Sequence, residues 1–307
     1  MAAIKTEELT KQYDGVTAVQ NLDLTVQEGE VFGFLGPNGA GKSTTINVLL
    51  DFVRPTSGHV SVLGHDPRTG SRAIRNRIGI LPEGYSLYDR LSAREHIKFA
   101  IEMEESDDDP RAVLDRVGLA DDAGRSVGGF SKGMGQRLAL GMALVGKPDL
   151  LILDEPTSGL DPSGTLKMRE IVREEVDRGA TVFFSSHLLD QVEAICDRVG
   201  IMTSGELVTV DSVEGLRESV GAESTLILTV DDRPGSLDLE TIKGVTGVTI
   251  NGATLRVSCS EPGVKAAVIS QVQSAGATVT DITTEETSLE DVFEKYTANG
   301  IAMEPDA

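Results

Sequence analysis

Residues 36–44 constrain the fold of this chain more strongly than any other segment. They read Gly36-Pro-Asn-Gly-Ala-Gly-Lys-Ser-Thr44, which matches the P-loop pattern of Gly, four residues and Gly-Lys-Ser/Thr at every fixed position. The preceding run, Glu30-Val-Phe-Gly-Phe-Leu35, predicts a buried strand, and residues 43–50 predict a helix. Because a P-loop functions between a strand and a helix, this setting predicts an α/β fold that binds a nucleoside triphosphate.

The residue types in this loop match the chemistry of phosphate binding. Glycine permits backbone conformations in which successive amide N–H groups point inward, and the following helix N-terminus adds partial positive charge. We expect Lys42 to pair with the β- and γ-phosphates and the Ser43 hydroxyl to ligate Mg²⁺. A glycine-rich turn that contains lysine by chance is the alternative, and the flanking segments argue against it. The expected nucleotide contacts are Gly36, Pro37, Asn38, Gly39, Ala40, Gly41, Lys42, Ser43 and Thr44.

Two adjacent carboxylates follow a second apolar run, Leu150-Leu-Ile-Leu-Asp154-Glu155. A continuous apolar run is typical of a strand buried on both faces, so the run places Asp154 at a strand end. We expect Asp154 to hold the Mg²⁺ shell as the Walker B carboxylate and Glu155 to polarise the attacking water. A solvated strand end is the alternative interpretation. A P-loop by itself leaves kinases, GTPases and many ATPases open.

Composition and charge limit the expected location and binding partners of the protein. The net charge is −21, from 49 acidic and 28 basic residues, and this excess opposes non-specific binding to nucleic acid or anionic lipid. No apolar run is long enough to span a bilayer, and the first residues lack the apolar core of a signal peptide, so we expect a cytoplasmic protein. Cys196 and Cys259 are expected to be reduced core thiols. The diffuse acidity suggests a high-salt (halophilic) cytoplasm, with an ordinarily acidic protein as the alternative.

Hydrophobic patterning divides the chain into a large domain at residues 1–220 and a small accessory domain at 221–307. In the large domain we expect strands at 3–9, 16–19, 22–26, 149–154 and 181–185, and helices at 93–104, 109–117, 133–145, 163–177 and 188–196. The helices between about 83 and 145 form an insertion in the α/β core. The acidic run at 104–109 favours a solvated loop over a metal site. In the α+β accessory domain we expect strands at 224–230, 254–258 and 278–283 and helices at 263–273 and 289–296.

Phe130-Ser-Lys-Gly-Met134 is the discriminating segment, because it precedes the Asp154 strand and opens a helix with Ser131 as a plausible N-cap. With this segment the chain resembles the nucleotide-binding subunits of ABC transporters. Their signature usually reads LSGGQ, and here it reads FSKGM, which retains Ser131 and Gly133. This drift is similar to that of the ABC-2 or drug-resistance exporter branch. The fold implied is a P-loop NTPase of the ABC ATPase class, with an N-terminal β subdomain, a helical subdomain and the small C-terminal α+β domain.

The resemblance implies roles for further residues. Ser131 and Gly133 would bind the γ-phosphate held by the other subunit, and Tyr13 would stack on adenine. Asp161, in Ser158-Gly-Leu-Asp161, matches the D-loop, and His187 matches the switch histidine that senses the γ-phosphate.

At the family's Q-loop glutamine this chain has Glu83, in Gly79-Ile-Leu-Pro-Glu83. A carboxylate keeps the oxygen ligand for Mg²⁺ but adds negative charge, which would either tighten metal binding or raise the pKa of the carboxyl group. The helical subdomain that follows is where the family's coupling helices dock. The C-terminal segment at 287–293 resembles the tail of this exporter branch, which serves dimerisation or regulation; an amphipathic helix without a special role is the alternative.

The function implied is an ATP-hydrolysing subunit that works as a homodimer on a separate multi-span permease, at the cytoplasmic face of the membrane. Its cofactors would be ATP and Mg²⁺, with no nucleic-acid partner. A soluble ABC-type ATPase acting on DNA or ribosomes is the alternative, and it predicts a basic face, tandem ATPase domains or zinc cysteines, which the sequence lacks. A nucleotide kinase would leave the 130–134 segment and His187 unexplained.

Overall fold

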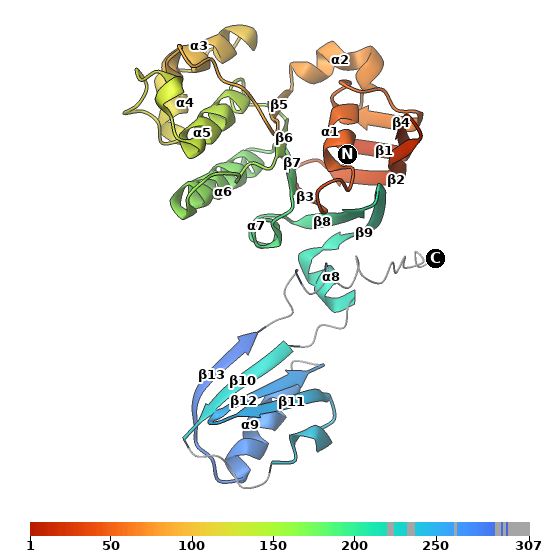
Figure 1. Ribbon diagram of the computed structural model, residues 1–307, viewed down its shortest axis with the longest axis vertical. Coiled ribbons are helices and arrows are strands. Elements are labelled where there is room, and N and C mark those ends of the chain that lie inside the picture. The colour runs from red at the N-terminus through yellow and green to blue at the C-terminus, as the bar shows by residue number, and fades with distance from the viewer. Residues whose placement is uncertain (220–223, 232–236, 261–262, 286–289, 291–292, 294–307) are drawn as a thin grey trace. The chain divides into compact units, whose positions relative to one another are not determined.

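The computed structural model describes residues 1–219, 224–231, 237–260, 263–285, 290 and 293 (Figure 1). The chain forms two compact units, and the boundary in the sequence lies between Ser212 and Val213. The expected boundary was at 220/221; in the structure, helix α8 (Val213–Ser219) belongs to the second unit. We call residues 1–212 the N-terminal unit and residues 213–300 the C-terminal unit.

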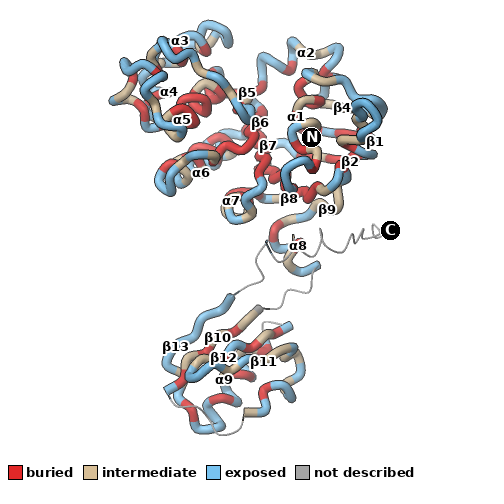
Figure 2. The backbone as a smooth tube through the Cα atoms, viewed as in Figure 1, coloured by how far each residue is buried: buried red, intermediate tan, exposed pale blue. Residues whose placement is uncertain are grey.

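A six-stranded sheet forms the centre of the N-terminal unit, in the order β5-β6-β7-β3-β8-β9. All neighbouring strands are parallel except β9, which pairs antiparallel with β8. Strands β3, β6 and β7 are buried along their whole length, as their continuous apolar runs predict, and Figure 2 shows β6 and β7 as buried backbone. The strands are β3 (Val31–Leu35), β5 (Ile78–Leu81), β6 (Leu150–Asp154), β7 (Thr181–Ser186), β8 (Arg198–Thr203) and β9 (Glu206–Ser212).

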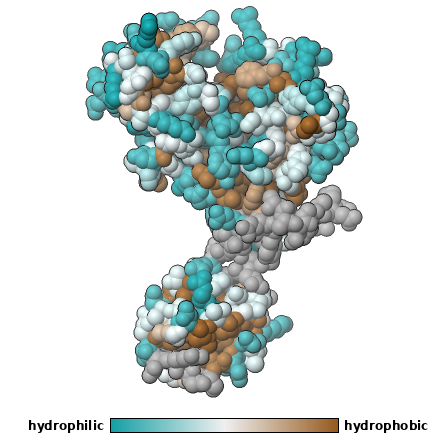
Figure 3. Space-filling model, in the orientation of Figure 1, coloured by the Kyte–Doolittle hydropathy of each residue, from teal (hydrophilic) through white to brown (hydrophobic). Residues whose placement is uncertain are grey.

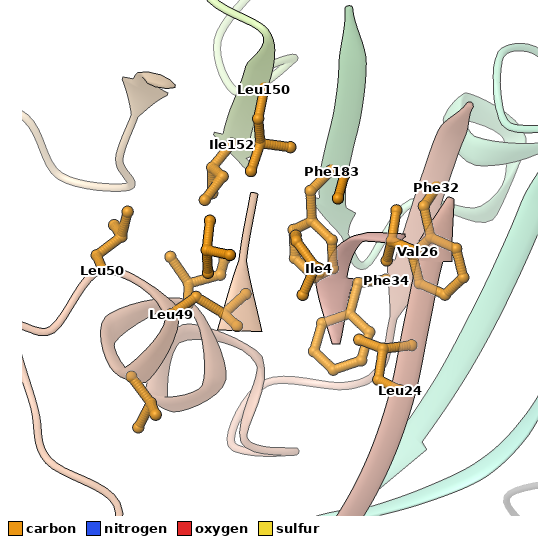
Figure 4. Close-up of a cluster of buried hydrophobic side chains, with 14 of the residues drawn as sticks. Ile4, Leu24, Val26, Phe32, Phe34, Leu49, Leu50, Leu150, Ile152 and Phe183 are labelled. Carbon is orange, nitrogen blue, oxygen red and sulfur yellow. The ribbon is translucent and has the colours of Figure 1, made fainter. Parts of the chain in front are cut away.

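A three-stranded antiparallel sheet, β2-β1-β4, covers the central sheet near the N-terminus. Its strands are β1 (Ala2–Tyr13), β2 (Val16–Gln27) and β4 (Ser57–Val62). The two short strands expected at 16–19 and 22–26 are one strand, whose pairing with β1 shifts register between them. An apolar core lies between the two sheets and helix α1 (Lys42–Leu49) (Figure 4). It includes Ile4, Leu24, Val26, Phe32, Phe34, Leu49 and Phe183.

Helices α3 (Ala93–Met103), α4 (Pro110–Arg116) and α5 (Lys132–Ala143) form the helical region, close to the expected ranges. Figure 1 shows this region and the three-stranded sheet on opposite sides of the central strands. Capping residues fix where the helices start. Ser92 and Glu95 form a capping box at the start of α3, and Asp109, the N-cap of α4, accepts a hydrogen bond from Arg111 N. The remaining elements are α2 (Pro67–Arg75), α6 (Pro162–Asp177), η1 (Val127–Gly129) and α7 (Leu189–Glu193), which is shorter than expected.

The acidic loop between α3 and α4 binds backbone and hydroxyl groups. Asp108 Oδ2 accepts hydrogen bonds from Ser106 Oγ and Gly146 N, both at 2.8 Å. In the described part of the chain, no three His, Cys, Asp or Glu side chains gather as metal ligands. The described helices also include none that is long and apolar enough to cross a membrane. On the viewed face, hydrophilic residues are interspersed with apolar patches (Figure 3).

Among its described residues, the C-terminal unit has a four-stranded antiparallel sheet, β11-β12-β10-β13, and the helices α8 and α9 (Val264–Ser274). Strands β10 (Ser224–Val230), β12 (Thr254–Cys259) and β13 (Val279–Glu285) match expected strands, while β11 (Val245–Asn251) and the 3₁₀ turn η2 (Leu239–Thr241) were not anticipated. The helix expected at 289–296 and the segment at 287–293 fall outside the described residues, except for Glu290 and Phe293. Cys196 and Cys259 are free and buried, which confirms the prediction of core thiols, and burial raises the pKa of both.

Candidate nucleotide-binding site

The P-loop lies between the end of β3 and the start of α1, as the sequence predicts. Gly39 (φ 83°) and Gly41 (φ 111°) adopt left-handed conformations, which favour glycine. A Cβ atom on Gly36 would lie 2.4 Å from Met202 O, and one on Gly41 would lie 2.4 Å from Ala18 O. The loop therefore packs too closely against neighbouring backbone for any larger residue at these two positions.

Lys42 folds its side chain back into the loop. Its Nζ donates hydrogen bonds to Gly36 O at 2.6 Å and to Pro37 O at 3.3 Å, and the residue is 7% exposed. Burial lowers the pKa of Lys42, while the nearby carboxylates Glu155, Asp154 and, less strongly, Glu83 act in the opposite direction. A buried cation thus faces a group of three carboxylates.

Asp154 is the last residue of β6 and is 5% exposed. Ser185 Oγ of the adjacent strand β7 donates a hydrogen bond to Asp154 Oδ1, and the Glu83 backbone N–H donates to the same carboxylate. Burial raises the pKa of Asp154, and the charge of Glu83 adds to the rise, while Ser185 and Lys42 oppose it. The carboxylate is held in place but carries an electrostatic cost that a cation would relieve.

Glu155 follows Asp154 in a left-handed conformation (φ 48°) that is uncommon for a residue with a side chain. Its Oε1 lies 2.7 Å from His187 Nδ1, and Ser186 Oγ donates to Oε2 at 3.4 Å. The contact with an ionised carboxylate requires a proton on His187 Nδ1. The β7 strand end thereby orients the buried carboxyl group of Glu155.

Gln136 of α5 contacts the backbone just after the β6 strand, and sequence reasoning missed it. Its Nε2 donates to Glu155 O at 3.3 Å and to Pro156 O at 3.0 Å, and the residue is 5% exposed. The available signal was an amide side chain two residues before the apolar run 138–140, where a buried polar side chain needs a partner.

One cavity brings together much of the expected site. It is lined by Ala18, Asn38, Gly39, Gly41, Lys42, Ser43, Thr44, Glu83, Asp154 and Glu155. Three further P-loop residues, Gly36, Pro37 and Ala40, do not belong to this lining, and neither does His187, which follows β7. Tyr13 also lies outside the lining, at the end of β1, with Lys11 Nζ 4.6 Å from its ring centroid. Its stacking on adenine therefore stays a prediction.

The signature residues form a second group. Ser131 Oγ accepts a hydrogen bond from Met134 N at 3.2 Å, which confirms Ser131 as the N-cap of α5. Asp161 caps α6 in the same way, accepting from Gly164 N at 2.8 Å. Neither these caps nor Gly133 line the P-loop cavity. In a single chain the expected site residues therefore divide between two places.

Comparison with known proteins identifies relatives of this chain. The ABC transporter family model matches residues 19–158. The bacitracin transport ATP-binding protein BcrA of Bacillus licheniformis is 42% identical over 67% of this chain and 68% of its own length. The linearmycin resistance ATP-binding protein LnrL of Bacillus subtilis is 33% identical over 94% of this chain and 96% of its own. The daunorubicin/doxorubicin resistance ATP-binding protein DrrA of Streptomyces peucetius is 32% identical over 95% and 91%.

Solved structures agree in fold. An ATP-binding subunit of an ABC transporter superimposes with a TM-score of 0.66 and 28% identity, over 71% of this chain and 93% of that one. CbiO1 of Clostridium perfringens, part of an ABC transporter complex, gives 0.63 and 29%, over 71% and 92%. The α/β P-loop architecture expected from the sequence is thus confirmed. The chain belongs to the ABC transporter family, as one of its ATP-binding and ATP-hydrolysing subunits.

Proposed function

We propose that this chain drives a separate membrane permease of the ABC-2 exporter type, and that two copies enclose two ATP molecules. The observation that carries the dimer is the division of the site: Lys42, Asp154 and Glu155 border one cavity, whereas Ser131 and Gly133 lie outside its lining. A second copy would bring its signature residues to this cavity. The relatives named for bacitracin transport and for linearmycin or daunorubicin/doxorubicin resistance support an exported cargo of antibiotic type.

The residues around the cavity suit Mg²⁺. This ion prefers oxygen ligands, and the Ser43 hydroxyl and the carboxylates of Asp154 and Glu83 supply them. The raised pKa of Asp154, caused first by burial and then by Glu83, indicates negative charge in need of a counter-ion. Bound Mg²⁺ would neutralise charge on the β- and γ-phosphates. Glu83 in place of the family's glutamine would strengthen this ligand set.

Hydrolysis then uses groups that the strand ends hold in position. P-loop amides and Lys42 would hold the phosphates, and Glu155 would accept a proton from the water that attacks the γ-phosphorus as the bond to the β-phosphate oxygen breaks. The hydrogen bond from His187 Nδ1 fixes Oε1 of Glu155, which leaves Oε2, 3.4 Å from Ser186 Oγ, as the better-placed acceptor. Tyr13 would stack on the adenine ring.

An apolar groove on the helical region supports contact with a permease. It begins just after Glu83 and includes two exposed aromatic residues, Tyr88 (69% exposed) and Phe99 (50% exposed). Exposed aromatic residues around a groove are typical of protein interfaces. A permease bound here would place the chain at the cytoplasmic face of the membrane and connect its movements to Glu83.

The Glu155→Gln variant tests the dimer and the chemistry together. An amide cannot accept the proton, so we expect MgATP binding without turnover and a shift from monomer to dimer mass by light scattering. Normal ATP hydrolysis by this variant would overturn the role of Glu155, and a monomer at saturating MgATP would overturn the shared site.

Co-purification distinguishes the permease from the alternative partner. Recovery of the tagged chain with a hydrophobic multi-span protein supports transport, whereas recovery with nucleic acid supports a soluble ABC-type ATPase. The net charge of −21 favours the first outcome, because like charges repel a phosphate backbone.

A further inference from the structure

The first turn of α5 packs directly against two loops of the nucleotide site. A Cβ atom on Gly133 would lie 2.9 Å from Gly159 O, and one on Gly135 would lie 3.2 Å from Tyr85 Oη. Lys132 contributes from the same turn, because its Nζ donates to Ser158 Oγ at 2.9 Å. The first turn of the helix therefore packs closely against the loop after β6.

Gln136 is a buried contact between this helix and that loop. Both of its bonds come from Nε2, to the carbonyl oxygens of Glu155 (3.3 Å) and Pro156 (3.0 Å). A buried amide is costly unless it finds partners, and these two carbonyl groups equally need donors inside the protein. The contact thus satisfies both sides of a buried interface.

The backbone of Glu155 needs such support. A left-handed conformation costs a residue with a side chain roughly 1 kcal/mol or more, so it persists only where neighbours hold it. On its amino side, Glu155 N donates to Ser185 O at 3.1 Å. On its carbonyl side, Glu155 O accepts hydrogen bonds from Ser158 N at 3.1 Å, within its own loop, and from Gln136 Nε2 at 3.3 Å, the contact that comes from α5. The β7 strand and α5 therefore hold Glu155 from either side while its carboxylate meets His187.

We propose that Gln136 is a positioning residue for Glu155 and that it couples Glu155 to the signature helix of the same chain. The inference rests on the proposed function, in which Glu155 serves the ATP in its own P-loop while Ser131 contacts the ATP of the partner subunit. Gln136 lies on the helix that Ser131 caps, so it connects the two nucleotide sites through one chain. A shift of α5 caused by nucleotide at the partner's site moves the carbonyl group of Glu155 and re-aims its carboxylate.

The Gln136→Met variant tests this role, because methionine has a similar length and volume but no donor. Misplacing a catalytic group by about 1 Å costs on the order of a hundredfold in rate, so we expect kcat to fall by roughly ten- to a hundredfold. The KM for ATP and the stoichiometry of ATP binding should stay unchanged, because Gln136 does not line the P-loop cavity. An unchanged kcat, or a loss of binding stoichiometry equal to the loss of rate, would overturn the proposal.

Arg137→Met is the matched control. Arg137 is the next residue of α5, and its Nη1 donates to a different backbone carbonyl, Gly118 O at 2.9 Å, away from the Glu155 loop. The same kind of bond is lost from the same helix, yet we expect kcat to stay within about twofold. An equal fall in both variants would reduce the role of Gln136 to general helix stability and overturn the proposal.

Two further measurements separate this proposal from the proposed function. Hydrogen exchange should speed up at Ser158 N and Leu160 N, which bond within the loop, in Gln136→Met but not in Arg137→Met. In single-turnover assays, Gln136→Met should add little to the loss caused by Glu155→Gln, because one residue acts through the other. Additive losses or unchanged exchange would overturn the link to Glu155. Normal turnover by Glu155→Gln alone would instead overturn the proposed function.

Discussion

The two units of this chain bury different kinds of residue. In the C-terminal unit, the described core is made of aliphatic residues with one cysteine. In the N-terminal unit, polar and charged residues are buried as well, although each such burial is costly without a partner. Every buried polar or charged residue found among the described positions lies there: Thr6, Lys42, Thr45, His96, Gln136, Asp154, Glu155, Thr157, Glu175, Thr181, Ser185 and Ser186.

The difference shows where chemistry constrains the sequence. Seven of these twelve polar residues lie in the P-loop helix, at the carboxyl ends of β6 and β7, or on α5 against them. The C-terminal unit satisfies the simpler requirement of burying one face of a sheet under a helix. We therefore interpret the N-terminal unit as the nucleotide-binding domain and the C-terminal unit as an accessory domain that folds on its own core.

The largest effect should come from Leu228→Ala, which tests whether the cores are independent. Leu228 lies on β10 and is fully buried in the C-terminal core. The cavity should lower the unfolding free energy of this unit by about 2 to 5 kcal/mol. ATP affinity of the N-terminal unit should not change, as measured by nucleotide titration beside urea unfolding of the same protein.

Ile282→Ala is the control for that substitution. Ile282 pairs with Leu228 across β10 and β13 but is 52% exposed, so its truncation should cost less than half as much. A parallel loss of ATP binding in Leu228→Ala would show that the two cores are not independent.

The next effect should come from Lys42→Ala, which acts only on the N-terminal unit. A charged hydrogen bond to a ligand contributes about 1.5 to 3 kcal/mol, so ATP affinity should fall roughly ten- to a hundredfold by calorimetric titration. Unfolding of the C-terminal unit should be unchanged. Lys167→Ala, an exposed pair with Glu170 on α6, should leave ATP affinity unaltered. Equal affinity in Lys42→Ala and the natural chain would contradict the phosphate role.

The smallest expected effect is the pH dependence of folding stability that Asp154 causes. Because the folded state raises the pKa of this carboxyl group, its contribution to stability is complete below the unfolded pKa, near 3.8, and is lost as pH rises through the higher folded value. Asp154→Asn cannot ionise and avoids this loss. Without nucleotide or Mg²⁺, we expect it to be more stable than the natural chain at pH 8.

Urea unfolding at several pH values measures this difference in stability, which should shrink as pH falls through the folded pKa of Asp154. No corresponding gain is expected in the C-terminal unit, where the described residues include no buried carboxylate. A constant advantage of Asp154→Asn at all pH values would show that charge burial is not its cause.

Features that short local patterns determine were predicted best from the sequence. The loop at 36–44, the Asp154 strand and the Ser131 cap each carry their own signal. The P-loop and Asp154 border one cavity because the carboxyl ends of parallel strands meet at one edge of the sheet. Contacts between distant segments were not predictable. Gln136 meets Glu155 only because α5 packs on the loop after β6, and β4 and β11 have short, mixed patterns that become strands through pairing. The catalytic and binding roles assigned to the residues stay predictions.

The bonds from Lys42 to Gly36 O and Pro37 O have a consequence for the rate of the catalytic cycle. Before ATP binds, they hold the loop through the protein's own atoms, so part of the conformational entropy of the loop is lost when the chain folds rather than when ATP arrives. A preorganised loop needs no search for its shape before capture. After product leaves, Lys42 can return to these carbonyl oxygens, so the next ATP should meet the same loop shape.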